Sequence, residues 1–124
     1  MMKETVNILK SLANPTRLRI MHALMQAKNE LCICEIMDSL RLPQYHISKH
    51  IRELKITGLV EEREEGRFVF YSIIRHKDGF HQSLIKALAE IDDRILTDDK
   101  KQMKRRLSLR VNGKCVIGLT KLEK

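Results

Sequence analysis

Apolar side chains recur every three or four residues through roughly the first half of the chain, and this spacing predicts four helices. The first two meet at Asn14 and Pro15, because Asn can cap a helix and Pro suits its first position. The third is expected over residues 31–40, and the fourth over residues 43–57, where Gly58 ends it. The side chains that share one side of each helix are Met2, Val6, Leu9 and Ala13; Leu18, Met21, His22 and Met25; Ile33, Ile36, Met37 and Leu40; and Ile47, Ile51 and Leu54.

The period of the pattern changes from a helical one to two residues after Gly58. The stretch LVEEREEGRFVFYSII predicts two strands, joined by a polar turn at Glu64, Glu65 and Gly66. Helical spacing then returns and predicts one long helix, and the later pair Asn112 and Gly113 predicts a short hairpin. The expected fold class is therefore mainly α with a small β-hairpin (α+β). The apolar stripe of the long helix consists of Phe80, Leu84, Leu88, Ile91 and Ile95.

Length, charge and cysteine count narrow the class of protein. A chain of 124 residues fits one domain, which we place over residues 1–97, followed by a basic C-terminal tail over residues 98–124. Residues 1–99 carry equal numbers of basic and acidic side chains, so the net charge of +8 comes wholly from residues 100–124. No apolar run reaches the length of about 18 residues that predicts a membrane span. Three cysteines without a disulfide spacing indicate the reducing cytoplasm.

A short helix, a tight break, a helix with a polar face and a hairpin form the layout of a winged helix-turn-helix. In that arrangement the fourth helix enters the major groove of double-stranded DNA, and the hairpin lies against the DNA backbone. A solvated surface is the alternative for the polar face, and a protein adaptor without an operator is the alternative for the fold. The predicted DNA-binding residues are Gln44, Tyr45, His46, Ser48, Lys49, His50, Arg52, Arg63 and Arg67.

Two of the three cysteines stand close together, at residues 32 and 34 of the stretch ELCICEIM. Residues two apart on a regular helix point about 200° away from each other, so Cys32 and Cys34 can face one ion only if the helix bends. Thiolates select soft ions such as trivalent arsenic, which prefers three sulfur ligands. The alternative is a pair of small, buried hydrophobic residues. Cys115, in the basic tail, is the only other thiol.

Three stretches, LANPTRLRIMHAL, ELCICEI and ISKHIRELKITGLVEEREEGRFVFYSI, resemble the ArsR/SmtB family of metal-responsive winged-helix repressors over residues 8–73. ELCICE is similar to the ELCVCD signature of the arsenite and antimonite sensors of that family. The resemblance implies a homodimer built on the first and fifth helices, which binds operator DNA when metal-free. It also implies release of the operator when As(III) or Sb(III) binds Cys32 and Cys34. Cys115, in the tail that the resemblance does not cover, is a candidate third ligand, and a small thiol such as glutathione is the alternative. No cofactor is expected for folding.

The sequence departs from this family pattern at two positions. Met37 stands where many of the arsenic sensors have a third cysteine, and Pro43 replaces the Ser that usually caps the fourth helix. The zinc sensors have the motif Asp-x-His early on the long helix and two further ligands later on it. If His81 is that histidine, Asp92 is the only metal-binding side chain at the other three ligand positions. A zinc- or cadmium-responsive repressor and a thiol-based redox or persulfide-responsive repressor stay as alternatives. An enzyme is not expected, because no phosphate- or oxyanion-binding glycine loop accompanies the cysteines.

Overall fold

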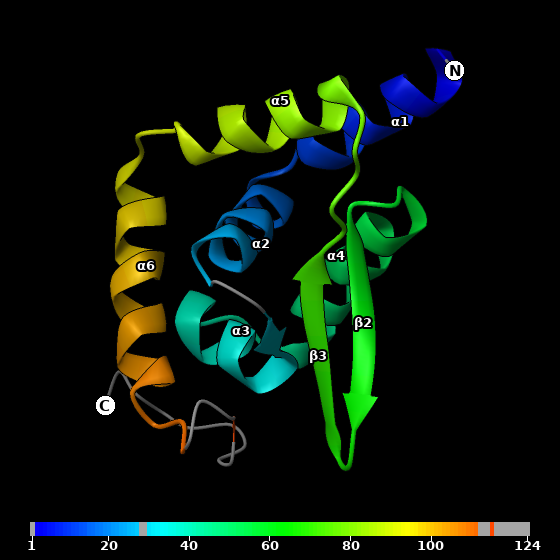
Figure 1. Cartoon of the computed structure of the whole chain (residues 1–124). Coiled ribbons are helices and arrows are strands. Elements are labelled where there is room, and N and C mark those ends of the chain that lie inside the picture. Colours follow the sequence, from blue (N-terminus) through cyan, green and yellow to red (C-terminus); the bar gives the residue numbers. More distant parts are fainter. Residues whose placement is uncertain (1, 28–29, 112–114, 116–124) are drawn as a thin grey trace.

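The computed structural model describes residues 2–27, 30–111 and 115 of the chain. In chain order its elements are α1 (Met2–Leu12), α2 (Pro15–Gln26), β1 (Leu31–Cys32), α3 (Ile33–Leu40), α4 (Gln44–Ile56), β2 (Val60–Glu65), β3 (Phe68–Ile73), α5 (Gly79–Ala89) and α6 (Arg94–Leu107) (Figure 1). No helix within the described residues is long and apolar enough to cross a lipid bilayer.

Helices α1, α2 and α4 form where the sequence predicts them. The side chain of Asn14 accepts a hydrogen bond of 3.1 Å from the backbone N–H of Arg17, with Pro15 in the first turn of α2. Helix α4 begins at Gln44 after Pro43, which provides no side-chain cap. The predicted inward stripe of α4 is confirmed, and it meets buried side chains of α2 and α3 in the core. Buried core residues from these three helices include Ile20, Met21, Ile36, Leu40, Ile47, Ile51 and Leu54.

The predicted hairpin is confirmed, and a third strand joins it. Strands β2 and β3 pair antiparallel, and the chain turns at Gly66, whose φ of 60° lies in the left-handed region that favours glycine. The two residues of β1 pair with β3, so the strand order is β1-β3-β2. The predicted helix over residues 31–40 is therefore wrong at its start, because Leu31 and Cys32 form a strand that pairs with β3 instead.

The prediction of one long helix after the hairpin is also wrong. Helix α5 ends at Ala89, and α6 starts at Arg94 after Asp93, whose side chain accepts a hydrogen bond of 2.8 Å from the N–H of Ile95. This cap starts a new helix, and the chain turns there so that α6 runs beside α2 and α3 (Figure 1). The predicted boundary after residue 97 thus falls inside α6. The hairpin predicted at Asn112 and Gly113 lies outside the described residues.

Candidate functional site

Cys32 lies at the junction between β1 and α3 rather than within the helix. Its backbone is extended, with φ −79° and ψ 161°, and its N–H donates a hydrogen bond of 3.0 Å to Oε1 of Glu35. Cys34 follows in the first turn of α3. The divergence of about 200° applies only when both residues are helical, so it does not apply here. The premise that both cysteines lie within one regular helix is therefore wrong, and the need to bend the helix does not follow from it.

The third cysteine lies beside the first. The sulfur atoms of Cys32 and Cys115 are 3.0 Å apart, and both residues are buried. Cys34, which is half-buried, packs against the same cluster together with Phe68 and Phe70. We call Cys32, Cys34 and Cys115 the thiol cluster. The fold brings Cys115 across 83 residues of sequence to one end of α3.

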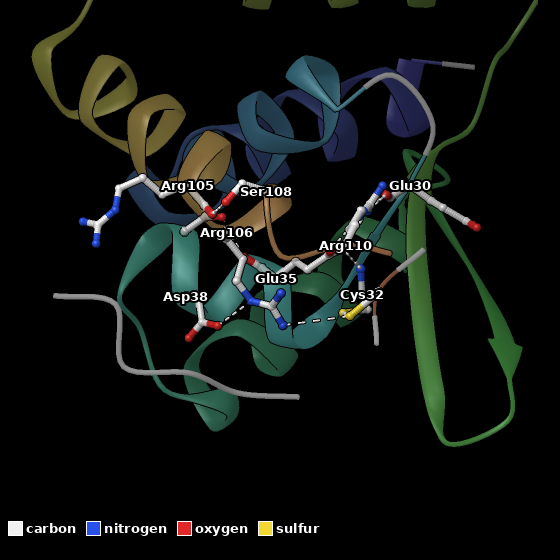
Figure 2. Close-up of polar contacts among 10 residues, drawn as sticks. Glu30, Cys32, Glu35, Asp38, Arg105, Arg106, Ser108 and Arg110 are labelled. Carbon is white, nitrogen blue, oxygen red and sulfur yellow. Dashed lines mark hydrogen bonds and ion pairs between the residues drawn. The ribbon is translucent and has the colours of Figure 1, made fainter. Parts of the chain in front are cut away.

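Two arginines from the C-terminal part of the chain pair with acidic residues of α3 close to Cys32 (Figure 2). Nε of Arg106, which is fully buried, donates a hydrogen bond of 2.6 Å to Asp38, and its Nη2 lies 3.9 Å from the sulfur of Cys115. Arg110 donates two hydrogen bonds of 2.7 Å to the two carboxylate oxygens of Glu35. Sequence reasoning missed these four residues, because no local pattern pairs acids of α3 with arginines so far along the chain.

Burial controls the protonation of the cluster. Desolvation raises the pKa of Cys32 far above its ordinary value, and the hydrogen bond with Cys115 adds to the shift. Burial also raises the pKa of Cys34, and the charges of Cys115 and Asp38 act in the same direction. Both side chains are therefore neutral thiols at neutral pH. A ligand of this cluster must displace or accept the thiol protons.

The predicted DNA-reading face of α4 is largely exposed. Tyr45 is 77% exposed, Gln44, Lys49 and Arg52 are exposed, and His46 and Ser48 are partly covered. His50 differs from the others, because it is buried. Its Nδ1 lies 3.1 Å from Nη1 of Arg17, so this histidine packs beneath the exposed face.

The two arginines of the wing have different surroundings. Arg67 is exposed in the turn between β2 and β3, with its guanidinium 5.4 Å from the ring centre of Phe68. Arg63 is exposed on β2 and forms ion pairs with Glu30 and Glu65. The charge of Arg63 is thus already paired within the protein, whereas Arg67 lies at the tip of the wing.

The helical core, a helix with an exposed polar face and a two-stranded wing define a winged helix-turn-helix DNA-binding protein. A profile of the bacterial regulatory protein family arsR matches residues 14–62. An uncharacterised HTH-type transcriptional regulator of Methanocaldococcus jannaschii is 36% identical over 72% of this chain and 96% of that protein. The chain therefore belongs to the ArsR family of transcriptional regulators, which is not a class of enzymes.

Two further similarities are to an arsenic resistance regulator and to a protein whose structure is that of its reduced form. An arsenic resistance transcriptional regulator of Pseudomonas putida is 30% identical over 74% of this chain and 71% of that protein. The structure of reduced HlyU from Vibrio cholerae is similar with a TM-score of 0.59 and 34% identity, over 69% of this chain and 85% of that chain.

Proposed function

We propose that this protein is a repressor that binds operator DNA as a homodimer and releases it when trivalent arsenic binds Cys32 and Cys34. The observation that carries the proposal is the position of these two thiols, at the end of β1 and in the first turn of α3. Only three residues, 41–43, separate this helix from α4. The similarity to an arsenic resistance regulator supports this choice of inducer. Antimony in the same oxidation state has the same ligand preference.

The protonation of the site favours arsenous acid over a divalent cation. When As(OH)3 reacts with three thiols, three As–S bonds form, three As–O bonds break, and each hydroxide leaves as water with one thiol proton. The thiols therefore need not ionise first, although burial raises the pKa of Cys32 and Cys34. Zinc or cadmium bound to three thiolates would instead release three protons and leave one negative charge in a buried site.

Linkage explains how binding near α3 can release DNA. Residues 41–43 alone separate α3 from α4, and Arg41 holds a left-handed conformation with φ 58°. A ligand that binds better to a different arrangement of α3 disfavours the arrangement of α4 that fits DNA. By the same thermodynamic cycle, operator DNA must weaken arsenite binding by an equal factor.

The DNA side of the proposal rests on the exposed face of α4 and on a dimer. A two-fold symmetric dimer presents two α4 helices, so the operator should be an imperfect inverted repeat with half-sites about one helical turn apart. Val6 and Leu9 of α1 and Phe80 of α5 are exposed apolar side chains, which supports a dimer interface on these two helices.

A DNA mobility shift tests the proposal directly. The DNA upstream of the coding gene should bind at low salt and be released by arsenite in the presence of a phosphine reductant, which does not chelate arsenic as a dithiol would. Failure to bind any inverted repeat in that DNA, or binding that arsenite does not change, would contradict the proposal. Release by cadmium but not by arsenite would favour the divalent-metal alternative.

A redox-responsive repressor is the second candidate function, because the Cys32 and Cys115 sulfurs are 3.0 Å apart. Hydrogen peroxide could oxidise the two thiols to a disulfide while it is reduced to two waters. The similarity to reduced HlyU supports this candidate. Release by peroxide that a reductant reverses, together with indifference to arsenite under reducing conditions, would favour it over the arsenic sensor.

A further inference from the structure

The C-terminal part of the chain contacts the proposed inducer site, although the family profile ends at residue 62 and leaves it out. Cys115 and the arginines that surround it follow the residues by which the family is recognised. Their place in the structure bears on the third ligand that trivalent arsenic needs. The inference below rests on the proposed function, since it concerns the same site.

Two ion pairs fasten this part of the chain to α3. Arg110 donates hydrogen bonds to both carboxylate oxygens of the buried Glu35. Its Nη2 also donates a hydrogen bond of 2.8 Å to the carbonyl of Glu30. Arg106 meets Asp38 one helical turn further along α3, and both side chains are almost fully excluded from solvent. Each pair joins one acid of α3 to one arginine in or just after α6. Cys115 lies beside these pairs, with its sulfur close to that of Cys32 and to the guanidinium of Arg106.

Glu35 links the backbone of Cys32 to the side chain of Arg110. Its Oε1 accepts hydrogen bonds from the N–H of Cys32 and from Nη2 of Arg110. One carboxylate therefore fixes the extended backbone of Cys32 and holds the arginine five residues before Cys115. A buried carboxylate without such donors would be strongly disfavoured, so this arrangement is coupled as a unit.

We propose that Cys115 supplies the third sulfur of the inducer site, and that the pairs Arg110–Glu35 and Arg106–Asp38 are positioning pairs that hold it there before the inducer arrives. Arsenous acid then exchanges its three hydroxides for the thiols of Cys32, Cys34 and Cys115 of one protomer, with three waters released. Because the sulfur of Cys115 already lies 3.0 Å from that of Cys32, binding does not have to bring these two thiols together. The two ion pairs are each neutral overall, which matches the neutral three-sulfur complex.

X-ray absorption at the arsenic edge tests the ligand, without any small thiol in solution. Wild-type protein should show three As–S bonds, and Cys115→Ser should show two As–S bonds and one As–O bond. Two sulfurs in the wild type, or three in Cys115→Ser, would overturn the inference. Absence of any arsenic binding by the wild type would instead contradict the proposed function, so the two failures are distinguishable.

A double variant tests the positioning role of the nearer pair. Glu35→Gln with Arg110→Gln keeps hydrogen-bonding groups but removes both charges, so Cys115 should leave Cys32 for part of the time. The arsenite concentration for half-release should rise by about tenfold, because apparent affinity falls with the population of the competent arrangement. Lys104→Gln, an exposed change on α6, is the matched control and should resemble the wild type, and Arg110→Lys should be intermediate.

Disulfide trapping measures the same positioning without arsenic. In a Cys34→Ser background, the oxidant diamide takes two electrons and two protons from Cys32 and Cys115 as their disulfide forms. The Glu35→Gln, Arg110→Gln change should slow this reaction several-fold, whereas Lys104→Gln should not. Equal rates and equal half-release concentrations in all folded variants would overturn the positioning role. If the double variant does not fold, Arg110→Lys replaces it in both measurements of positioning, and X-ray absorption on Cys115→Ser still decides the third ligand.

Discussion

Cys32 takes its position from two interactions that a helical residue would not have. Its backbone pairs with Phe70 of β3, and its N–H donates to the side chain of Glu35. These interactions hold it in the extended conformation directly before α3. Its sulfur is therefore free of the helical geometry that separates residues two apart, and it lies in the buried cluster with Cys115.

Replacement of a single thiol at the start of α3 should remove the response to arsenite. Cys32→Ser or Cys34→Ser leaves at most two sulfurs in the site, so arsenite should no longer release DNA at concentrations that empty the wild-type operator. Operator affinity without arsenite should stay within about threefold of the wild type, since neither residue lies on α4. Fluorescence anisotropy with labelled operator measures both quantities. A serine variant that still responds fully would refute the assignment of that thiol.

The raised pKa values of Cys32 and Cys34 predict a different pH dependence for each class of inducer. Both thiols stay protonated near neutral pH, and arsenous acid removes their protons as water. Its half-release concentration should therefore change little between about pH 6 and pH 8. Cadmium must displace protons into solution, so its apparent affinity should rise with pH, by about tenfold per unit for each proton released. Titrations of the operator complex at several pH values compare the two; a steep rise for arsenite would contradict this chemistry.

At the scale of elements, the arginines of α4 and the wing differ. Some are exposed and can contact DNA phosphates, whereas one is already paired with glutamates of the protein. Arg52 on α4 and Arg67 at the wing tip are exposed, whereas Arg63 is paired with two glutamates. The electrostatic part of DNA binding should therefore come more from Arg52 and Arg67 than from Arg63.

Alanine substitution should reveal this difference in the salt dependence of operator binding. Arg52→Ala and Arg67→Ala should each reduce the slope of log K against log salt by about one per protomer, and Arg63→Ala by less. Lys77→Ala is the control, because this exposed lysine follows β3 at the end of the wing away from the tip. Anisotropy titrations over a range of salt concentrations give the slopes. Equal slopes for Arg67→Ala and the wild type would show that the wing tip does not contact the DNA backbone.

The break between α5 and α6 depends on the cap at the start of α6. The side chain of Asp93 caps α6 through the N–H of Ile95, and Leu96 and Met103 of that helix are buried. Asp93→Ala should lower the free energy of unfolding by about 1 kcal/mol, as loss of a helix cap does. Asp92→Ala removes the same charge one residue earlier and should have a smaller effect. Urea denaturation followed by circular dichroism measures both; equal effects would show that charge, and not the cap, is responsible.

At the scale of the whole molecule, exposed apolar side chains locate the proposed dimer interface on α1 and α5. Leu9 is 50% exposed and Val6 is 37% exposed, although both lie on the apolar stripe of α1. Leu88, in contrast, is 8% exposed within one protomer and belongs to its core. A charge at Leu88 would therefore disturb the fold, and Leu9 offers the cleaner test of association.

Leu9→Glu should dissociate the dimer and weaken operator binding, because one protomer presents one α4 to one half-site. Sedimentation velocity at micromolar concentration should give a dimer for the wild type and a monomer for the variant, with similar circular dichroism spectra. Ile56→Glu places the same charge on an exposed apolar residue of α4 and should sediment as the wild type. A wild-type monomer that binds the full operator tightly would contradict the proposed dimer.

The sequence by itself determined the elements whose signal is local. The cap at Asn14, the stripe of Ile47, Ile51 and Leu54, and the alternation through β2 and β3 each depend on residues close together in the chain. Such patterns arise because one side of each element must be buried. They were sufficient to predict the winged helix-turn-helix and the exposed face of α4.

Only the tertiary structure decided the arrangement of the thiol cluster. The partner of Leu31 and Cys32 is a strand some 40 residues later, and two residues are too few to show a period of two. The separations are larger still between Arg106 and Asp38, 68 residues, and between Arg110 and Glu35, 75 residues. Nothing in the spacing of the chain pairs these charges, because the loss of solvation that makes each buried charge require a partner exists only once α6 has packed on α3.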